Sequence, residues 1–112
     1  MIKIIFNYDE NRILKRFEFS GHAGREPAGE NVTCAAVSAL ALTFSRSLVG
    51  LLKIKLSGEI KAGEIRLTLD EIAPEVRKDL SLLTSSLRLG LDSINEKYGN
   101  TIQIIENNNS GR

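Results

Sequence analysis

Apolar and polar residues alternate along the first twenty positions, which is the pattern of β-strands that bury one face. The alternation covers residues 2–8 and resumes at Phe17, after a polar stretch, Asp9-Glu10-Asn11, that suits a tight turn. We therefore expect an N-terminal β-hairpin. Its apolar positions are Ile2, Ile4, Phe6, Tyr8, Phe17 and Phe19.

The pattern changes between Val32 and Leu52, where apolar residues fall on nearly every side of a helix until Ser45. Such a helix is expected to be covered by a sheet on one face and by more protein on another. Polar residues interrupt this stretch too often for a membrane span, so we expect a buried helix. The interrupting residues are Thr33, Ser38, Thr43, Ser45, Arg46 and Ser47.

Strand-like alternation returns in residues 54–60 and 65–69. The connection between them, Lys61-Ala62-Gly63-Glu64, is short and contains glycine, so we expect a second hairpin. Within its first strand, Gly58 is expected to mark a β-bulge.

A second helix is predicted from Pro74 to Tyr98, because proline suits the first position of a helix and Gly99 suits the position after its end. Residues 101–105 then add a last strand. The helical apolar positions recur at spacings of three and four: Val76, Leu80, Leu83, Leu87, Leu91, Ile94 and Tyr98.

These elements predict an α/β fold: a mixed sheet with two main helices in the order ββαββαβ, built in two or three layers. A length of 112 residues suits a single compact domain. We place this domain at residues 1–106 and expect the polar tail, residues 107–112, to fray. The composition, 42% hydrophobic and 26% charged, is that of an ordinary globular protein.

The charge of the chain indicates which partners it can bind. The formal charge is +1, from 15 basic and 14 acidic residues, and no basic run is long enough to follow a phosphate backbone. We therefore expect no direct nucleic-acid partner.

Cys34 is the only cysteine, so no internal disulfide can form. With no export signal in the first residues, we expect a cytoplasmic protein without a membrane partner.

Candidate chemistry lies between Phe19 and Cys34, where three glycines and a proline interrupt regular structure. Asn is favoured at helix N-caps, so we expect Asn31 to cap the helix and Cys34 to lie in its first turn. Unpaired N–H groups and the helix dipole at that end would lower the pKa of the thiol. The same N–H groups, including that of Cys34, would stabilise an oxyanion.

His22 is the only histidine and would serve as the acid and base partner of a Cys34 thiolate. Ser38 lies four residues after Cys34, on the same helix face, where its hydroxyl would line the site. Each residue also has a structural interpretation. A lone cysteine among alanines usually packs in a core, a lone histidine is usually a loop residue, and a helical serine often bonds to a backbone carbonyl.

Two segments, Ser20-Gly21-His22-Ala23-Gly24 and the stretch from Gly29 to Leu40 with Cys34-Ala35-Ala36-Val37-Ser38, resemble the ribosomal-processing cysteine protease family, called Prp. The resemblance includes the spacing between histidine and cysteine. It implies a homodimeric endopeptidase that removes the N-terminal extension of a bacterial large-subunit ribosomal protein, number twenty-seven. It also implies that His22 is the general base and acid and Cys34 the nucleophile, with Gly21 and Ser38 as supporting residues.

One position departs from the family. Members commonly have Asp where this chain has Asn31, so a carboxylate that would orient the histidine is replaced by an amide. A neutral amide orients histidine in papain-like proteases, so Asn31 remains a candidate supporting residue. The loop from Ala23 to Glu30 would have to move to admit a peptide, with Gly24 and Gly29 as hinges.

Other classes of function fit the sequence less well. One histidine and one cysteine make an incomplete ligand set, so we expect no metal site and no cofactor. The glycine-rich loop lacks the Gly-Lys-Ser/Thr ending of a phosphate-binding loop. The remaining alternative is a non-catalytic, dimeric ribosome-associated or binding module in which Cys34 only packs.

Overall fold

The predicted N-terminal hairpin is formed by β1 (Ile2–Tyr8) and β2 (Leu14–Ser20), which pair antiparallel. Its turn is held by the carboxylate of Asp9, whose Oδ1 accepts hydrogen bonds from the backbone N–H groups of Asn11 at 2.8 Å and Ile13 at 3.0 Å. The computed structural model describes residues 2–21, 28–61 and 63–108.

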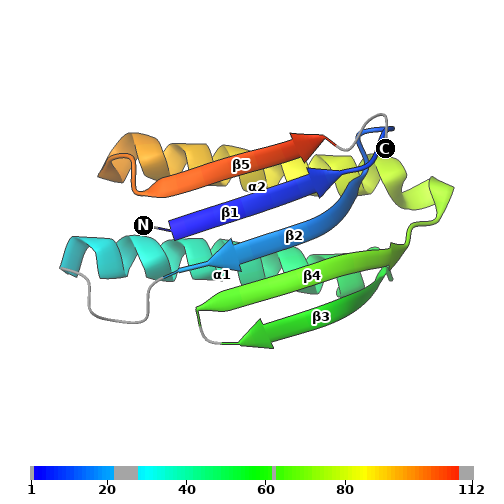
Figure 1. Cartoon of the computed structure of the whole chain (residues 1–112), viewed down its shortest axis with the longest axis horizontal. Coiled ribbons are helices and arrows are strands. Elements are labelled where there is room, and N and C mark those ends of the chain that lie inside the picture. Colours follow the sequence, from blue (N-terminus) through cyan, green and yellow to red (C-terminus); the bar gives the residue numbers. More distant parts are fainter. Residues whose placement is uncertain (1, 22–27, 62, 109–112) are drawn as a thin grey trace.

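The sheet has the strand order β3-β4-β2-β1-β5, counting the strands found in the described residues (Figure 1). The second predicted hairpin supplies β3 (Lys55–Lys61) and β4 (Glu64–Glu71). The last strand, β5 (Ile102–Asn108), lies parallel to β1, whereas every other pair is antiparallel. The sheet is therefore mixed, as predicted.

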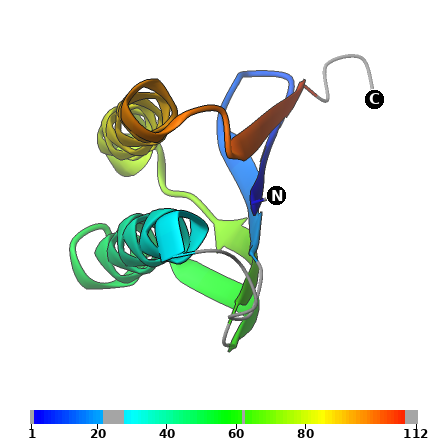
Figure 2. The same cartoon turned by 90° about the vertical axis from the view of Figure 1, so that its left-hand side faces the viewer.

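Helices α1 (Ala28–Gly50) and α2 (Arg77–Tyr98) cover the same face of the sheet (Figure 2). The order ββαββαβ and the α/β class are confirmed, and of the two arrangements predicted, the molecule has two layers. The opposite face of the sheet is polar and includes ion pairs such as Arg16–Glu18 at 3.0 Å.

The core lies between these layers. The alternating residues of β1 and β2 point into it, and the Phe17 ring meets the Phe44 ring of α1 edge-on, with centroids 5.2 Å apart. This is a favourable aromatic geometry. Among the buried residues are Ile4, Phe6, Phe17 and Phe19 of the sheet, Val37, Ala41, Phe44 and Leu48 of α1, and Leu80, Leu87 and Leu91 of α2.

Helix α1 begins at Ala28, one turn before the predicted start. Asn31 is therefore inside the helix, and the prediction that it caps the helix is wrong. Ala28 and Glu30 are good helix formers, and the added turn takes the place of a cap worth about 1 kcal/mol even though Gly29 disfavours the helix by a similar amount. Gly29 also lies in the helix, which removes it from the predicted loop.

By length and hydropathy alone, part of α1 would be able to cross a membrane. Its segment Val32–Gly50 has a mean hydropathy of 1.6, so the interrupting polar residues do not lower the hydropathy as far as we expected. In the fold, this segment instead packs on the sheet through Val37, Ala41, Phe44 and Leu48, which are all buried.

Gly58 is not at a bulge, contrary to the prediction. The irregularity in the pairing of β3 and β4 lies between Lys55 and Leu56. Gly58 instead has a φ of +126°, and a Cβ built on it would lie 1.9 Å from the backbone oxygen of Arg66. A glycine is required there because the two backbones approach closely.

The start of the second helix and the end of the last strand also differ from the prediction. Pro74 begins a short 3-10 turn, η1 (Pro74–Val76), and α2 follows it. Strand β5 continues beyond residue 105 to Asn108, because Asn107 and Asn108 pair with β1. The Nδ2 of Asn107 donates to the Oδ1 of Asn7 at 2.8 Å. Residues 109–112 of the predicted tail lie outside the described residues.

Candidate active site

Gly21 brings the end of β2 against the Cys34 thiol of α1. A Cβ built on Gly21 would lie 3.1 Å from the Sγ of Cys34 and 3.2 Å from the Cζ of Phe19. The half-buried thiol therefore occupies space that any larger residue at position 21 would restrict. The candidate nucleophile and the glycine before His22 meet, although 13 positions separate them in the sequence.

The position of Gly21 is held by the turn between β3 and β4. Its backbone N–H donates to the backbone oxygen of Gly63 at 2.9 Å. Gly63 has a φ of +78°, in the left-handed region that glycine adopts without steric cost. Two hairpins that are distant in sequence thus meet beside the thiol.

Cys34 lies six residues after the first residue of α1, rather than in its first turn as predicted. The effect of a helix dipole falls off within the first turn. Only the first four N–H groups of a helix are free, so the N–H of Cys34 belongs to the helical ladder. The prediction that Cys34 lies in the first turn, where the free N–H groups of the helix are, is therefore wrong.

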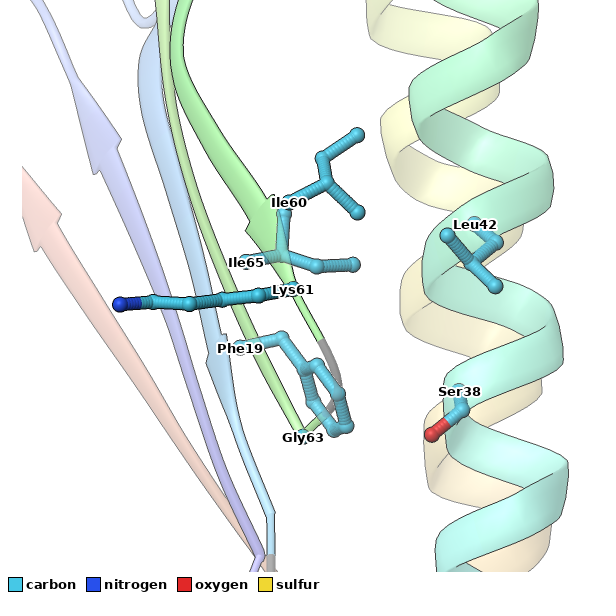
Figure 3. Close-up of a pocket in the computed structure, with 7 residues that line it drawn as sticks. All are labelled: Phe19, Ser38, Leu42, Ile60, Lys61, Gly63 and Ile65. Carbon is cyan, nitrogen blue, oxygen red and sulfur yellow. The ribbon is translucent and has the colours of Figure 1, made fainter.

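A cavity of about 400 Å³ opens one helical turn from Cys34, between α1 and the edge of the sheet (Figure 3). The Oγ of Ser38 lies at its wall and has no hydrogen-bond partner among the residues that the structure describes. Back-bonding to a helix carbonyl, the structural interpretation of Ser38, is instead seen at Ser45. The cavity is lined by Phe19, Ser38, Leu42, Ile60, Lys61, Gly63 and Ile65.

The structure brings together only some of the residues predicted for the site. Gly21 and Cys34 are in contact, and Ser38 lies one turn further along α1. His22 lies outside the described residues, as does most of the predicted loop, and the side chain of Asn31 is not described. The roles of His22 and Asn31 remain predictions.

Leu42 and Ile60 form an apolar wall that the sequence patterns do not predict as part of a site. Their exposure depends on which strand forms the edge of the sheet, and no local pattern specifies this. The one available signal was the placement of large apolar residues at positions that a helix and a strand leave exposed.

No group of three or more His, Cys, Asp or Glu side chains in residues 2–21, 28–61 and 63–108 is arranged to hold a metal ion. Because His22 is not among these residues, the expectation of a metal-free site stays a prediction.

Solved structures of similar fold include two bacterial proteins. The ribosomal processing protease Prp from Staphylococcus aureus, in complex with a substrate peptide, has a TM-score of 0.78 and 17% identity, covering 95% of this chain and 99% of that one. SMU.848 from Streptococcus mutans has a TM-score of 0.77 and 26% identity, and the match covers 96% of this chain and 95% of that one. The Staphylococcus aureus enzyme is also known with a covalently linked product peptide. That structure has a TM-score of 0.74 and 18% identity, and the match covers 95% of this chain and 99% of that one.

No curated protein matches the sequence of this chain. The sequence model of one family, described as cysteine protease Prp, matches residues 1–103. This match spans both hairpins, both helices and the segment that carries His22 and Cys34. The chain therefore belongs to the cysteine protease Prp family.

Proposed function

We propose that this cysteine protease cleaves its substrate through Cys34 and His22. His22 takes the proton of the Cys34 thiol, and the sulfur attacks the scissile carbonyl. The C–N bond breaks as His22 gives this proton to the departing amine, which leaves a thioester on Cys34. A water molecule, deprotonated by His22, then attacks the thioester. The C–S bond breaks, the peptide leaves as a carboxylic acid, and His22 returns the proton to the thiolate sulfur.

The observation that carries this proposal is the contact between Gly21 and the Cys34 thiol. His22 follows Gly21 directly in the sequence, so the only imidazole of the chain is covalently attached next to a residue that touches the thiol. Gly21 leaves room for the sulfur, and Ser38 presents a hydroxyl one turn away. We assign both as supporting residues, together with Asn31.

We infer that the substrate is the N-terminal extension of large-subunit ribosomal protein twenty-seven, removed in the cytoplasm during ribosome biogenesis. Membership in the Prp family and the similarity to a ribosomal processing protease with a bound substrate peptide support this inference. The covalently linked product on the Staphylococcus aureus relative supports a covalent intermediate. The protein acts as a homodimer, which sedimentation analysis of the purified chain would test.

The decisive experiment is cleavage of a peptide that spans the extension junction. The intact protein is expected to cut it, Cys34→Ala to abolish cleavage, and His22→Ala to lower kcat by at least about a hundredfold. Leu89→Ala, on the exposed face of α2, is the matched control and is expected to retain full activity. Undiminished cleavage by Cys34→Ala would contradict the proposal.

The same experiment separates the enzyme from a non-catalytic binding module. A module would bind the peptide with an affinity that Cys34→Ala leaves unchanged, and the intact protein would release no product.

Asn31→Asp restores the carboxylate that relatives commonly have. A rise in kcat with KM unchanged is expected if this position orients His22.

A further inference from the structure

The turn between β3 and β4 contacts the proposed active site, although it carries none of the residues predicted for that site. Gly63 in this turn accepts a hydrogen bond from the backbone N–H of Gly21 at 2.9 Å. Strands β2 and β4 pair as far as Ser20 and Glu64, so this bond extends their ladder by one residue. The backbone of Gly21 is therefore held by a second hairpin as well as by its own strand.

This hydrogen bond acts on a residue that touches the thiol. A Cβ built on Gly21 would lie 3.1 Å from the Sγ of Cys34, so a small movement of the Gly21 backbone changes the space that the sulfur occupies. His22 follows Gly21 directly in the sequence. The bond therefore fixes the residue to which the candidate acid and base is attached.

Gly63 is suited to this contact by its backbone conformation. Its φ of +78° lies in the left-handed region, which most residues with a side chain avoid. Among the described residues, a Cβ built on Gly63 would meet the backbone oxygen of Gly21 at 3.6 Å, which is ordinary contact. A side chain would therefore fit at this position. The constraint is on the backbone conformation that directs the carbonyl toward Gly21.

The turn is carried by a well-ordered end of two paired strands. Lys61 pairs with Glu64, so only two residues separate β3 from β4. Glu64 also forms ion pairs with Lys61, at 3.8 Å, and with Arg66. Figure 3 shows Gly63 at the tip of this turn, on the wall of the cavity. A two-residue turn between paired strands has few conformations, so it holds Gly21 more firmly than a long loop would.

We propose that Gly63 is a positioning residue of the protease, whose backbone carbonyl holds Gly21 against the Cys34 thiol and so sets where the sulfur lies. The proposal rests on the proposed function and extends it to a residue outside the two segments that carry the predicted site. A displacement of about 1 Å at a reacting group lowers the rate by about a hundredfold. Loss of this hydrogen bond is therefore expected to lower kcat while the protein stays folded.

The most direct test removes the donor without changing a side chain. Residues 1–33 are synthesised with an ester in place of the amide that carries the N–H of Gly21, and are ligated to the rest of the chain through Cys34, the only cysteine. For the junction peptide, kcat is expected to fall by about tenfold or more and KM to change by less than about twofold.

The matched control is the same replacement at Asn11. Its N–H donates to Asp9 Oδ1 at 2.8 Å, in the turn at the other end of the β1–β2 hairpin. This ester also removes one backbone donor, but far from the thiol. It should therefore leave kcat unchanged. Equal kcat values for the two esters would overturn the positioning role.

Two variants at position 63 test the conformation of the turn. Gly63→Val introduces a β-branched residue that adopts a positive φ only with strain, so kcat should fall by about tenfold or more. Gly63→Asn tolerates this conformation and should recover most of the loss. Thermal unfolding shows whether each variant is folded, and the ester at Gly21 decides the question if Gly63→Val is not. Equal kcat values for the two folded variants would contradict the proposal.

The rate at which iodoacetamide alkylates Cys34 separates this proposal from the proposed function. The ester at Gly21 should change this rate by about threefold or more, and the ester at Asn11 should not. Cleavage by the intact protein with a kcat that the Gly21 ester leaves unchanged would overturn the positioning role and leave the protease function standing. A changed alkylation rate without any cleavage by the intact protein would support the positioning of the thiol and contradict the function.

Discussion

At the scale of single residues, Gly21 leaves the space that the Cys34 thiol occupies. A methyl group at position 21 would lie 3.1 Å from the Sγ and 3.2 Å from the Phe19 ring, which is tighter than ordinary contact. Gly21→Ala is therefore expected to displace the thiol. Displacing a reacting group by a fraction of an ångström to an ångström lowers kcat/KM by about tenfold to a hundredfold.

Steady-state kinetics and urea unfolding of Gly21→Ala would together test whether the displaced thiol lowers activity without unfolding the protein. The expected result is a fall in kcat with little change in the free energy of unfolding, because the crowded atoms belong to side chains that can shift. The exposed Gly50→Ala is the control, since nothing lies within 4 Å of the added methyl group. Full activity of Gly21→Ala would show that the thiol does not depend on this contact.

At the scale of the strands, Gly58 permits β3 and β4 to approach. Gly58→Ala places a methyl group against the backbone oxygen of Arg66 and imposes a φ of +126° on alanine. The backbone conformation alone costs about 1 to 3 kcal/mol, and the clash adds to this cost. Chemical denaturation should show the loss, whereas Gly50→Ala should be neutral or slightly stabilising. Equal stabilities of the two variants would contradict this account.

The connection between α2 and β5 depends on the side chain of Asn95. Its Oδ1 accepts from the backbone N–H groups of Thr101 at 3.2 Å and Ile102 at 3.0 Å, and its Nδ2 donates to the Ile102 oxygen at 3.0 Å. Asn95→Ala is expected to lower the free energy of unfolding by about 1 to 3 kcal/mol. Asn95→Asp retains both acceptor bonds and should cost less, and the reverse order of stabilities would contradict this role.

At the scale of the whole molecule, a polar cluster joins β1, β5 and α2. The Tyr8 hydroxyl donates to Glu106 Oε2 at 3.0 Å, and Arg88 pairs with Glu106 and with Asp92. The charged side chains of the ion pairs are 36–47% exposed, so each pair contributes about 0 to 1 kcal/mol. The cluster therefore orients α2 on the sheet more than it stabilises the fold.

Tyr8 reports on this cluster through its ionisation. Burial, followed by the hydrogen bond and the negative charge of Glu106, raises the pKa of Tyr8 above its ordinary value of 10.0. A raised pKa means that the neutral phenol stabilises the fold below pH 10, and that this contribution is lost as the pH rises through the raised pKa. When the absorbance of tyrosinate is followed as the pH rises, Tyr8→Phe should remove the signal that appears at the raised pKa, and Tyr98→Phe should not.

Local patterns predicted most of the elements because burial on one face of a strand or helix leaves a period in the sequence. The turn at Asp9, the strands of both hairpins and the end of α2 at Gly99 follow from such patterns. The start of α1 did not, because the preference of Asn31 for a cap is opposed by the helix propensities of Ala28 and Glu30, and these local preferences are similar in size. The requirement for glycine at position 58 depends on Arg66 of another strand and has no local signature.

The sequence by itself determined the α/β class, the element order and the family, since periodicity and the motif around His22 and Cys34 are local properties of the chain. Only the tertiary structure decided that β3 forms an edge of the sheet and that both helices share one face. Strand order results from packing between distant segments, which no short stretch encodes. The contact of Gly21 with the thiol and the open cavity beside Leu42 follow from that order.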